Sequence, residues 1–582
     1  MLEPTTAANP STAAFDQLVQ DEWTWRLAEF PRQATQAGVH EHDHRLERVD
    51  AASRAARQAR WRDTRAALQR IDATQLNAAR RVDLAVYANQ IDTLLGELDH
   101  GGALMPMDGD SAFFSYLPDL WREQPLQTTE QLQSHLGRLA AIGTYFDDHI
   151  ALLTEALQQG VVLPSVVMQG RDAPLANMLA LSQASATPYF TPFKHRPSAV
   201  PPAQFERLAE EAQRVIDTQV LPAYQRLADF MREHYLPRTR STTAARDLPG
   251  GEAFYAERVR AFTTLPLTAA QVHEQGRAEV ARILDDMHHL MKACGWTGTL
   301  AGFLAQLRSD PQHYPRSAEE LLGRASWICK RVDTALPRWF GRLPRQPFGV
   351  APVPDDIAPF YTSGRYVPAP ADGDQAALYW VNTCKLESRA WYALPALTLH
   401  EAVPGHHLQI ALAAENTDQP AFRRLEGLSA HSEGWALYAE FLGSEMGIYQ
   451  TPLEEFGRAS YEMWRACRLV VDTGLHTLGW SREQAQGYLR DHTALSEHEV
   501  TTEVDRYIGW PGQALSYKVG EMQFRALRRQ AESTLGARFD LRAFHDHLLA
   551  QGCVPLPCLR QQVEDWVAQR MQRTQRMQRT MA

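Results

Sequence analysis

The chain has 582 residues and a formal net charge of −10, with 44% hydrophobic and 22% charged residues. This balance is that of a folded globular protein, and the length suffices for several ordinary domains or one large two-lobed one. The negative charge argues against a general nucleic-acid surface, and no apolar run is long enough to cross a bilayer.

The N-terminal segment, Met1 to Asp16, is polar and lacks the apolar core of a signal peptide. The sequence therefore predicts a cytoplasmic location. A chain that began after a removed signal peptide would look the same, which keeps a periplasmic or secreted location open. The six cysteines form no C-x-x-C pair and are expected to be buried or inert thiols.

Apolar residues recur at helical spacing along most of the chain, which predicts a mainly α-helical protein. Arg238 to Gly251 is polar, contains Pro and Gly, and marks the predicted boundary between two lobes. We expect an N-terminal helical lobe at 1–245, a catalytic lobe at 246–570 and a polar tail at 571–582. The best strand candidate is Ala376 to Asn382, and helical spacing dominates after it.

The strongest chemical signal is the segment His-Glu-Ala-Val-Pro-Gly-His-His at 400–407. A metallohydrolase needs imidazoles that converge on zinc and a carboxylate that takes a proton from the attacking water. The usual arrangement is H-E-x-x-H on one helix, with the two histidines one turn apart. Here Pro404 stands where the second histidine is expected. We predict His400 as the first ligand and Glu401 as the general base.

The second histidine ligand depends on the backbone around Pro404. In a straight helix His406 would face away from His400, whereas His407 would share its face about 10.5 Å further along the axis. Pro404 breaks the helix because it lacks an N–H and its ring clashes with the preceding turn, and Gly405 permits unusual torsions. A widened turn would return His406 to the metal. We predict His406 as the second ligand, keep His407 as the alternative, and expect one of them to line the substrate pocket.

A third ligand is expected from a separate helix, and the segment Ala-His-Ser-Glu-Gly-Trp-Ala-Leu-Tyr-Ala-Glu at 430–440 supplies one. Glu433 lies far enough beyond His406 for a loop and a returning helix. Glu433 and Glu440 share a helical face. Glu433 is the predicted ligand, and Glu440 is expected to accept a hydrogen bond from a ligating imidazole.

Reactive side chains are also dense at 503–520. Acyl transfer needs a hydrogen-bond donor for the developing oxyanion, and Tyr507 and Tyr517 are the candidates. Arg506 or Lys518 could bind a substrate carboxylate. A further set of polar residues recurs at helical spacing, and its last three members can pair along one face: Arg465, Arg468, Asp472 and His476. That set fits either a buried network under the metal or an ordinary polar contact between helices.

These motifs resemble the bacterial domain-of-unknown-function family 885. The resemblance rests on four segments in order, with His42-Asp-His-Arg-Leu46 and Arg81-Val-Asp-Leu84 in support. The four are His-Glu-Ala-Val-Pro-Gly-His-His-Leu-Gln at 400–409, Glu-Gly-Trp-Ala-Leu-Tyr-Ala-Glu at 433–440, Val-Asp-Thr-Gly-Leu-His at 471–476 and Pro-Gly-Gln-Ala-Leu-Ser-Tyr-Lys-Val-Gly at 511–520.

The family is grouped with zincin-like peptidases. The resemblance implies a large, two-lobed helical fold with a deep cleft and a small β-sheet near the active site, similar to angiotensin-converting enzyme. Dipeptidyl peptidase III also resembles this chain, because its zinc motif contains an extra residue. By the same analogy the strand at 376–382 is expected at a sheet edge beside the cleft, where it could pair with an extended peptide, and Asn382 could contact the substrate.

The combined prediction is a zinc metallopeptidase in which His400, His406 and Glu433 hold Zn²⁺ and Glu401 activates water. Its expected partner is a short or extended peptide. One alternative is a metal-dependent amidase acting on a small non-peptide amide. Another is a non-catalytic binding module on a degenerate zincin scaffold, which the unusual histidine spacing motivates. The intact Glu401 argues against the binding module, because a structural metal site needs no base.

Overall fold

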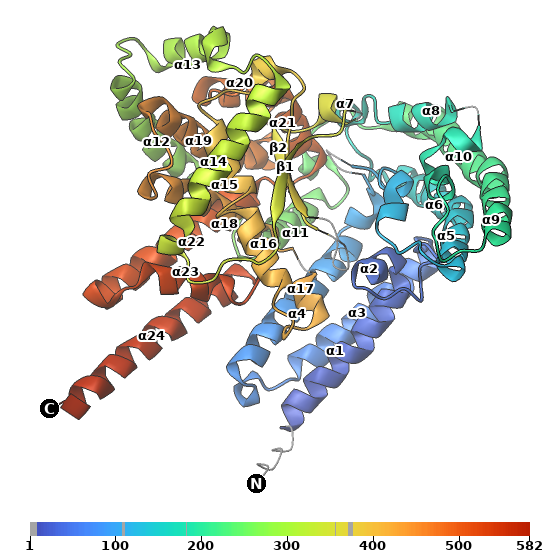
Figure 1. Cartoon of the computed structure of the whole chain (residues 1–582), viewed down its shortest axis with the longest axis horizontal. Helices are drawn as coiled ribbons and strands as arrows, with labels where there is room; N and C mark the ends of the chain where they lie inside the picture. The colour runs from blue at the N-terminus through green and yellow to red at the C-terminus, as the bar shows by residue number, and fades with distance from the viewer. Residues whose placement is uncertain are drawn as a thin grey trace. The chain divides into compact units, whose positions relative to one another are not determined.

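The computed structural model of the chain describes residues 9–107, 111–181, 183–355, 357–369, 376–425 and 427–581. These residues form a mainly helical protein with a small β-sheet, which confirms the predicted fold class (Figure 1). The chain divides into two compact units, Met1–Phe254 and Tyr255–Ala582. In the described part of the chain, no helix combines the length and the apolar character needed to span a membrane.

Several helices of the first unit begin at polar capping residues. Asn9 accepts a hydrogen bond from the N–H of Ser11, and Asn77 accepts one from the N–H of Arg80. Its helices are α1 (Pro10–Glu29), α2 (Pro31–Gln36), α3 (Ala51–Gln69), α4 (Ala78–Asp99), α5 (Thr129–Ala140), α6 (Ile142–Gln159), α7 (Ser165–Met168), α8 (Ala173–Leu179), α9 (Pro202–Val215) and α10 (Leu221–Phe230). The next helix, α11 (Gly251–Thr263), contains the division between the units, a few residues beyond the predicted lobe boundary.

A buried carboxylate joins three helices of the first unit. Glu22 of α1 is fully buried and pairs with Arg26, with 2.8 Å between the carboxylate oxygen and the guanidinium nitrogen. The indole N–H of Trp61 on α3 donates to Glu22 at 2.9 Å, and the hydroxyl of Tyr87 on α4 also donates to it. These partners compensate the cost of burying the charge and hold the three helices together.

The second unit contains the remaining helices and the sheet. Its helices are α12 (Ala269–Ala293), α13 (Leu300–Ser309), α14 (Ala318–Trp339), α15 (Leu394–Glu401), α16 (His406–Ala414), α17 (Ala421–Arg424), α18 (Ser429–Glu445), α19 (Pro452–Thr473), α20 (Arg482–His492), α21 (Glu497–Gly509), α22 (Leu515–Leu535), α23 (Leu541–Leu549) and α24 (Leu556–Met581). Helix α24 includes residues 571–581 of the predicted polar tail, and the last residue of that tail lies outside the described residues.

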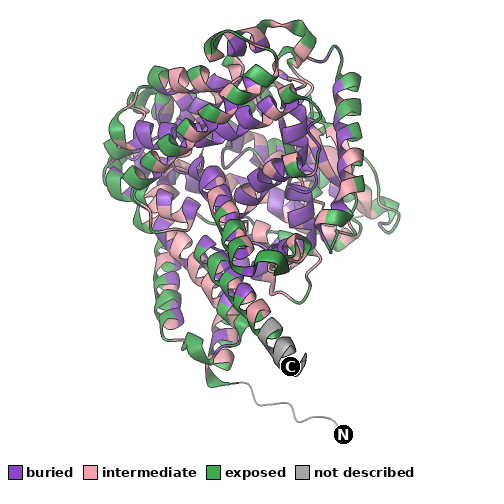
Figure 2. Cartoon of the chain, turned by 90° about the vertical axis from the view of Figure 1, so that its left-hand side faces the viewer, coloured by how far each residue is buried: buried purple, intermediate pink, exposed green. Residues whose placement is uncertain are grey.

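Helix α19 is the buried centre of the second unit. Every residue from Ala459 to Thr473 is buried, whereas the outer helices expose one face (Figure 2). A helix that is buried on all sides is normally apolar throughout. Helix α19 nevertheless carries Glu462, Arg465 and Arg468, so each of these charges needs partners inside the protein.

The sheet has three strands, β1 (Phe348–Pro352), β2 (Gly364–Val367) and β3 (Ala377–Val381), in the order β1-β3-β2. β3 runs parallel to β1 and antiparallel to β2. The predicted strand at 376–382 is therefore present, but its expected place at a sheet edge is wrong. The alternation of buried residues in β3 indicates a half-buried strand, yet it carries no information about its neighbours, which come from a stretch rich in Pro and Gly.

Two glycines let α18 and α22 cross in backbone contact. A Cβ atom on Gly520 would lie 2.0 Å from the carbonyl oxygen of Ala430, and one on Gly434 would lie 2.5 Å from the carbonyl carbon of Gly520. Because no larger residue fits at the crossing, the side chains next to it are brought close together. Glu433 of α18 and Tyr517 of α22 are two of these neighbours.

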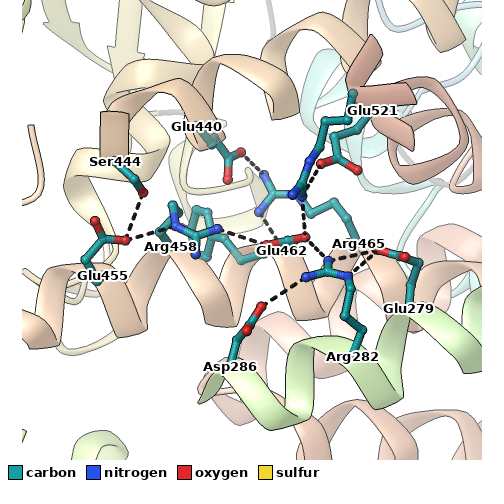
Figure 3. A network of polar contacts seen from close by, with 12 residues as sticks. Glu279, Arg282, Asp286, Glu440, Ser444, Glu455, Arg458, Glu462, Arg465 and Glu521 are labelled. Carbon is teal, nitrogen blue, oxygen red and sulfur yellow. Dashed lines mark hydrogen bonds and ion pairs between the residues drawn. The ribbon is translucent and has the colours of Figure 1, made fainter. Parts of the chain in front are cut away.

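A cluster of buried charges joins α12, α19 and α22 (Figure 3). The ammonium group of Lys518 lies 3.0 Å from a carboxylate oxygen of Glu279, 2.9 Å from Glu462 and 2.8 Å from Glu521. Arg282, Arg458 and Arg525 also contact Glu462. Burial alone would raise the pKa of Glu462, but these four cations hold it well below the usual range.

The glycine crossing predicts a large stability loss for Gly520→Ala. The added methyl group overlaps the backbone of Ala430, so the free energy of unfolding should fall by about 2–3 kcal/mol. Gly323→Ala on α14 is the matched control, because a Cβ at this position meets no atom within 4 Å. The control substitution should stabilise the helix by about 0.5–1 kcal/mol. Denaturant unfolding of the two variants tests this, and equal stability would contradict the close crossing.

The buried charge cluster predicts a specific acid sensitivity. Because the pKa of Glu462 is lower in the folded protein than in the unfolded chain, its stabilisation is complete above the ordinary pKa of about 4.5 and is lost as the pH falls below it. Glu462→Gln should therefore be less stable at neutral pH and show a shallower loss of stability below pH 4.5. Chemical denaturation across this pH range tests the difference. The control is Glu497→Gln, which removes an exposed ion pair with Arg490. Parallel pH profiles for wild type and Glu462→Gln would refute it.

Candidate active site

The helix that carries His400 stops where the sequence places its proline. Helix α15 ends at Glu401, the Val403–Pro404 peptide bond is cis, and α16 begins at His406. The turn between them is held by two hydrogen bonds. The N–H of His407 donates to the carbonyl oxygen of residue 402 at 3.1 Å, and the indole N–H of Trp435 on α18 donates to the carbonyl oxygen of Pro404 at 2.8 Å.

Gly405 lies directly against the end of α15. A Cβ at this position would be 1.9 Å from the carbonyl oxygen of His400 and 2.4 Å from that of Leu399. This close approach folds the start of α16 back onto the last turn of α15. As a result the rings of His400 and His406 lie nearly perpendicular, with their centroids 4.8 Å apart.

The two imidazoles point at one carboxylate. Nε2 of His400 lies 3.3 Å from Oε2 of Glu433, and Nε2 of His406 lies 3.4 Å from the same oxygen. Burial disfavours ionisation of Glu433, but the two histidines hold its pKa well below the usual range. Burial lowers the pKa of His400, yet its contacts with the carboxylates of Glu433 and Glu440 outweigh this effect and raise the pKa to about 9. The site therefore attracts positive charge.

These three side chains fit a zinc ion. Two imidazole nitrogens and one carboxylate oxygen are a common zinc ligand set, and the three ligand atoms lie within 4.8 Å of one another. Ligands bound at about 2.0–2.1 Å in a tetrahedral arrangement lie about 3.3 Å apart, which matches the nitrogen-to-oxygen separations around Glu433. Oε2 of Glu433 is buried and makes no hydrogen bond of normal geometry with the described residues.

Glu440 fixes the orientation of the first histidine. Its Oε1 lies 2.8 Å from Nδ1 of His400, which leaves Nε2 directed at Glu433. Glu440 in turn contacts a guanidinium nitrogen of Arg465 at 3.3 Å (Figure 3). Nδ1 of His406 is buried and has no hydrogen-bond partner within the described ranges, so the two imidazoles are held unequally.

Glu401 is tied to the backbone of the sheet. Its Oε2 accepts a hydrogen bond of 2.7 Å from the N–H of Tyr366 on β2. β2 is an edge strand, and this N–H is directed at Glu401 instead of joining the ladder with β3. The Glu401 carboxylate also contributes to the raised pKa of His400, because it lies within electrostatic reach of that imidazole. The predicted base therefore lies beside the predicted ligands.

Tyr517, and not Tyr507, lies next to this cluster. The rings of Tyr517 and His400 are stacked with their centroids 6.4 Å apart. Burial raises the pKa of Tyr517, and the nearby charge of Glu433 raises it further. The hydroxyl of Tyr507 instead accepts hydrogen bonds from Trp464 at 2.9 Å and from Nε of Arg468 at 3.0 Å, deeper in the protein.

The two predicted carboxylate-binding residues lie in other clusters. Arg506 contacts Glu503 at 3.0 Å and Gln513 at 2.6 Å. Lys518 is fully buried among the three glutamates of the charge cluster described above. None of these contact partners is His400, His406 or Glu433.

Asn382 and His407 flank the sheet and not the histidine cluster. The fully buried Asn382 donates to the carbonyl oxygens of Ala358 and Tyr361 at 2.9 Å, and so orders the loop before β2. Nδ1 of His407 lies 3.2 Å from the hydroxyl of Tyr366, and burial lowers the pKa of His407 to about 4. His407 thus borders the strand that holds Glu401.

The structure adds one contributor that the sequence does not indicate, the N–H of Tyr366, and it brings Arg465 of the predicted polar set into contact with Glu440. The N–H of Tyr366 acts through the backbone, which leaves no signal in the sequence. Arg465 is a charged residue in a helix with apolar residues on every side, and that pattern does carry a signal. The other three members of the polar set have separate partners: Glu503 and Tyr507 for Arg468, Tyr255 and Gly512 for Asp472, and the carbonyl oxygen of Tyr507 for His476.

Comparisons with known proteins identify the family. The model of the family described as "Bacterial protein of unknown function (DUF885)" matches residues 31–563. No curated protein matches the sequence. The crystal structure of a candidate lipoprotein from Colwellia psychrerythraea is similar over 97% of this chain and 100% of its own, with 27% identity and a TM-score of 0.87. A candidate lipoprotein of unknown function from Shewanella oneidensis is similar over 95% of this chain and 99% of its own, with 19% identity and a TM-score of 0.70. The chain therefore belongs to the DUF885 family of bacterial proteins.

Proposed function

We propose that this protein is a zinc-dependent peptidase with His400, His406 and Glu433 as metal ligands. The observation that carries the proposal is the convergence of two imidazoles on one buried carboxylate at tetrahedral spacing, with Glu401 beside them. A structural zinc site has four protein ligands and needs no base, whereas a catalytic one has three and keeps a position open. The described residues supply three ligands and a base.

Each residue of the site then has a defined task. Bound zinc would polarise the scissile carbonyl group and make water easier to deprotonate. Glu401, held by the N–H of Tyr366, takes the proton from the attacking water and later gives it to the leaving amine. The hydroxyl of Tyr517 donates to the oxyanion that develops on the carbonyl group. Glu440 keeps the ring of His400 turned toward Glu433.

The position of β2 favours a peptide over a small non-peptide amide. Glu401 bonds to the backbone of an edge strand, so a substrate at Glu401 lies next to backbone groups that can form a ladder. An extended peptide can add to such an edge through main-chain hydrogen bonds, which a small metabolite cannot do. We infer that short or extended peptides are the substrates.

The comparisons also support a location outside the cytoplasm. The similar structure from Colwellia psychrerythraea is that of a candidate lipoprotein, and it covers nearly the whole chain at 27% identity. We propose a periplasmic or secreted location for this protein in place of the cytoplasmic one. Fractionation of cells that carry the tagged full-length gene product tests this proposal.

Replacing the base should remove hydrolysis and keep the metal. Glu401→Gln conserves the shape of the side chain but cannot accept the proton of water, so kcat should fall by about 10³-fold. Zinc content after dialysis should stay at the wild-type level, because Glu401 is not among the three ligands. Metal analysis and a peptide-hydrolysis assay on the same samples test this. Glu532→Gln on the exposed face of α22 is the control, and full activity of Glu401→Gln would refute the mechanism.

The two neighbouring histidines should differ in their effect on zinc. His406→Ala removes a ligand, and zinc affinity should fall by more than the roughly 10–100-fold that loss of an outer partner causes. His407→Ala removes a contact with Tyr366 and should keep the zinc affinity within that range. Competition with a zinc-binding dye measures both. The opposite result would assign the second ligand to His407.

A further inference from the structure

Two arginines of α19 are held rigidly behind the candidate active site. The guanidinium carbons of Arg465 and Arg468 each lie 4.3 Å from the ring centroid of Trp464, and both side chains are almost fully buried. The indole N–H of Trp464 is itself fixed by the hydroxyl of Tyr507 at 2.9 Å. Stacking on a fixed aromatic ring leaves a guanidinium little freedom, so its donors are already oriented before a ligand arrives.

One nitrogen of Arg468 has no acceptor within the described residues. Its Nε donates to Tyr507 at 3.0 Å and its Nη2 donates to Glu503 at 2.9 Å, but its buried Nη1 has no hydrogen-bond partner. Arginine carries five N–H donors, and a buried donor of a charged group without an acceptor is costly. A ligand with an acceptor oxygen would remove that cost.

The charge around Arg468 favours an anionic ligand over a neutral one. Glu503 is the carboxylate that contacts Arg468, and it is shared with Arg506, which lies 3.0 Å from it. Glu503 is thus contacted by two buried guanidinium groups, and Arg506 also lies within electrostatic reach of Asp472. A bound water molecule would satisfy the hydrogen bond, whereas a carboxylate would satisfy the hydrogen bond and also pair with the charge of the guanidinium group.

Arg468 lies within a short distance of the candidate zinc ligands. Its guanidinium carbon is 4.0 Å from the ring centroid of Tyr517, and that ring is 6.4 Å from the ring of His400. Arg468 and His400 are therefore separated by no more than about three extended residues. An anion on Arg468 would belong to the first or second residue after the bond that is cleaved at His400.

The surroundings of Arg468 also close the site. Three buried side chains, Trp464, Tyr507 and Glu503, pack on it, so in the described part of the chain they fill the space that a continuing peptide would need. An acidic side chain would leave the chain free to continue, whereas the α-carboxylate is where the chain ends. A site closed on this side suits a C-terminal carboxylate.

We propose that Arg468 binds the C-terminal carboxylate of a peptide and that the protein removes one or two residues from the C-terminus. The proposal rests on the function proposed above. Water is consumed in the step: its oxygen joins the carbonyl carbon, the carbon–nitrogen bond breaks, and the leaving amine takes a proton. The products are a shortened peptide and a free amino acid or dipeptide.

The test compares N-acetylated peptides that differ at their C-terminus. Each peptide is made as the free acid and as the amide, and the zinc-loaded full chain is assayed by mass spectrometry. We expect the free acid to be cleaved at least about 100-fold faster, with loss of one or two residues. Equal cleavage of both forms, or internal cleavage, would overturn the inference and leave the peptidase function standing. Cleavage of neither form would contradict the peptidase function itself.

Substitution of Arg468 supplies the second test. Arg468→Gln should lower kcat/KM for the free acid about 100-fold more than kcat/KM for the amide, which removes the preference. Arg468→Lys keeps the charge and should retain part of the preference. Arg482→Gln, which breaks an ion pair with Asp505 on the outside of α20, is the control. If Arg468→Gln still prefers the free acid over the amide, Arg468 does not bind the C-terminal carboxylate. Rapid cleavage of peptide amides that carry an acidic side chain would also overturn this assignment. The comparison on the wild-type protein remains decisive if Arg468→Gln does not fold.

Discussion

The candidate site depends on a contact between backbone atoms. Gly405 lies so close to the carbonyl groups of Leu399 and His400 that no side chain fits between them. That contact folds α16 back onto the end of α15 and turns the ring of His406 toward the ring of His400. In an uninterrupted helix the same two histidines would face different sides. The break at Pro404 and Gly405 thus brings His400 and His406 together, although their spacing would place them on different sides of a continuous helix.

The second organising feature is a buried helix that carries charge. Three charged residues of helix α19 contact neighbouring helices. Arg465 contacts Glu440, Arg468 contacts Tyr507 and Glu503, and Glu462 forms an ion pair with Lys518. These contacts reach α18, α21 and α22, so one helix holds the elements that carry the third candidate ligand and the candidate oxyanion donor. Because buried charges tolerate only a few arrangements of their partners, this network restricts how the surrounding helices can pack.

The sequence predicts part of this arrangement well, and the reason is local. Helical periodicity and the proline–glycine break are properties of neighbouring residues, so the helical fold and the interruption after Glu401 follow from them. The grouping of His400, His406 and Glu433 in space is visible in the structure, while their role as ligands remains a proposal. Contacts between elements that are distant in the sequence could not be predicted from the spacing of neighbouring residues. The central place of β3, the burial of Lys518 and the backbone contact of Tyr366 depend on partners far away in the sequence.

The buried lysine also has a consequence for metal content. Glu279, Glu462 and Glu521 bring three carboxylate oxygens within 4.8 Å of one another, which is a geometry that hard divalent cations favour. The ammonium group of Lys518 lies among them and fills that position with a charge that belongs to the chain. A cation that is part of the polypeptide cannot dissociate, exchange or be replaced by calcium or magnesium. Of the two groups of described residues that could hold a metal ion, this leaves the histidine cluster as the one open to the zinc ion proposed above.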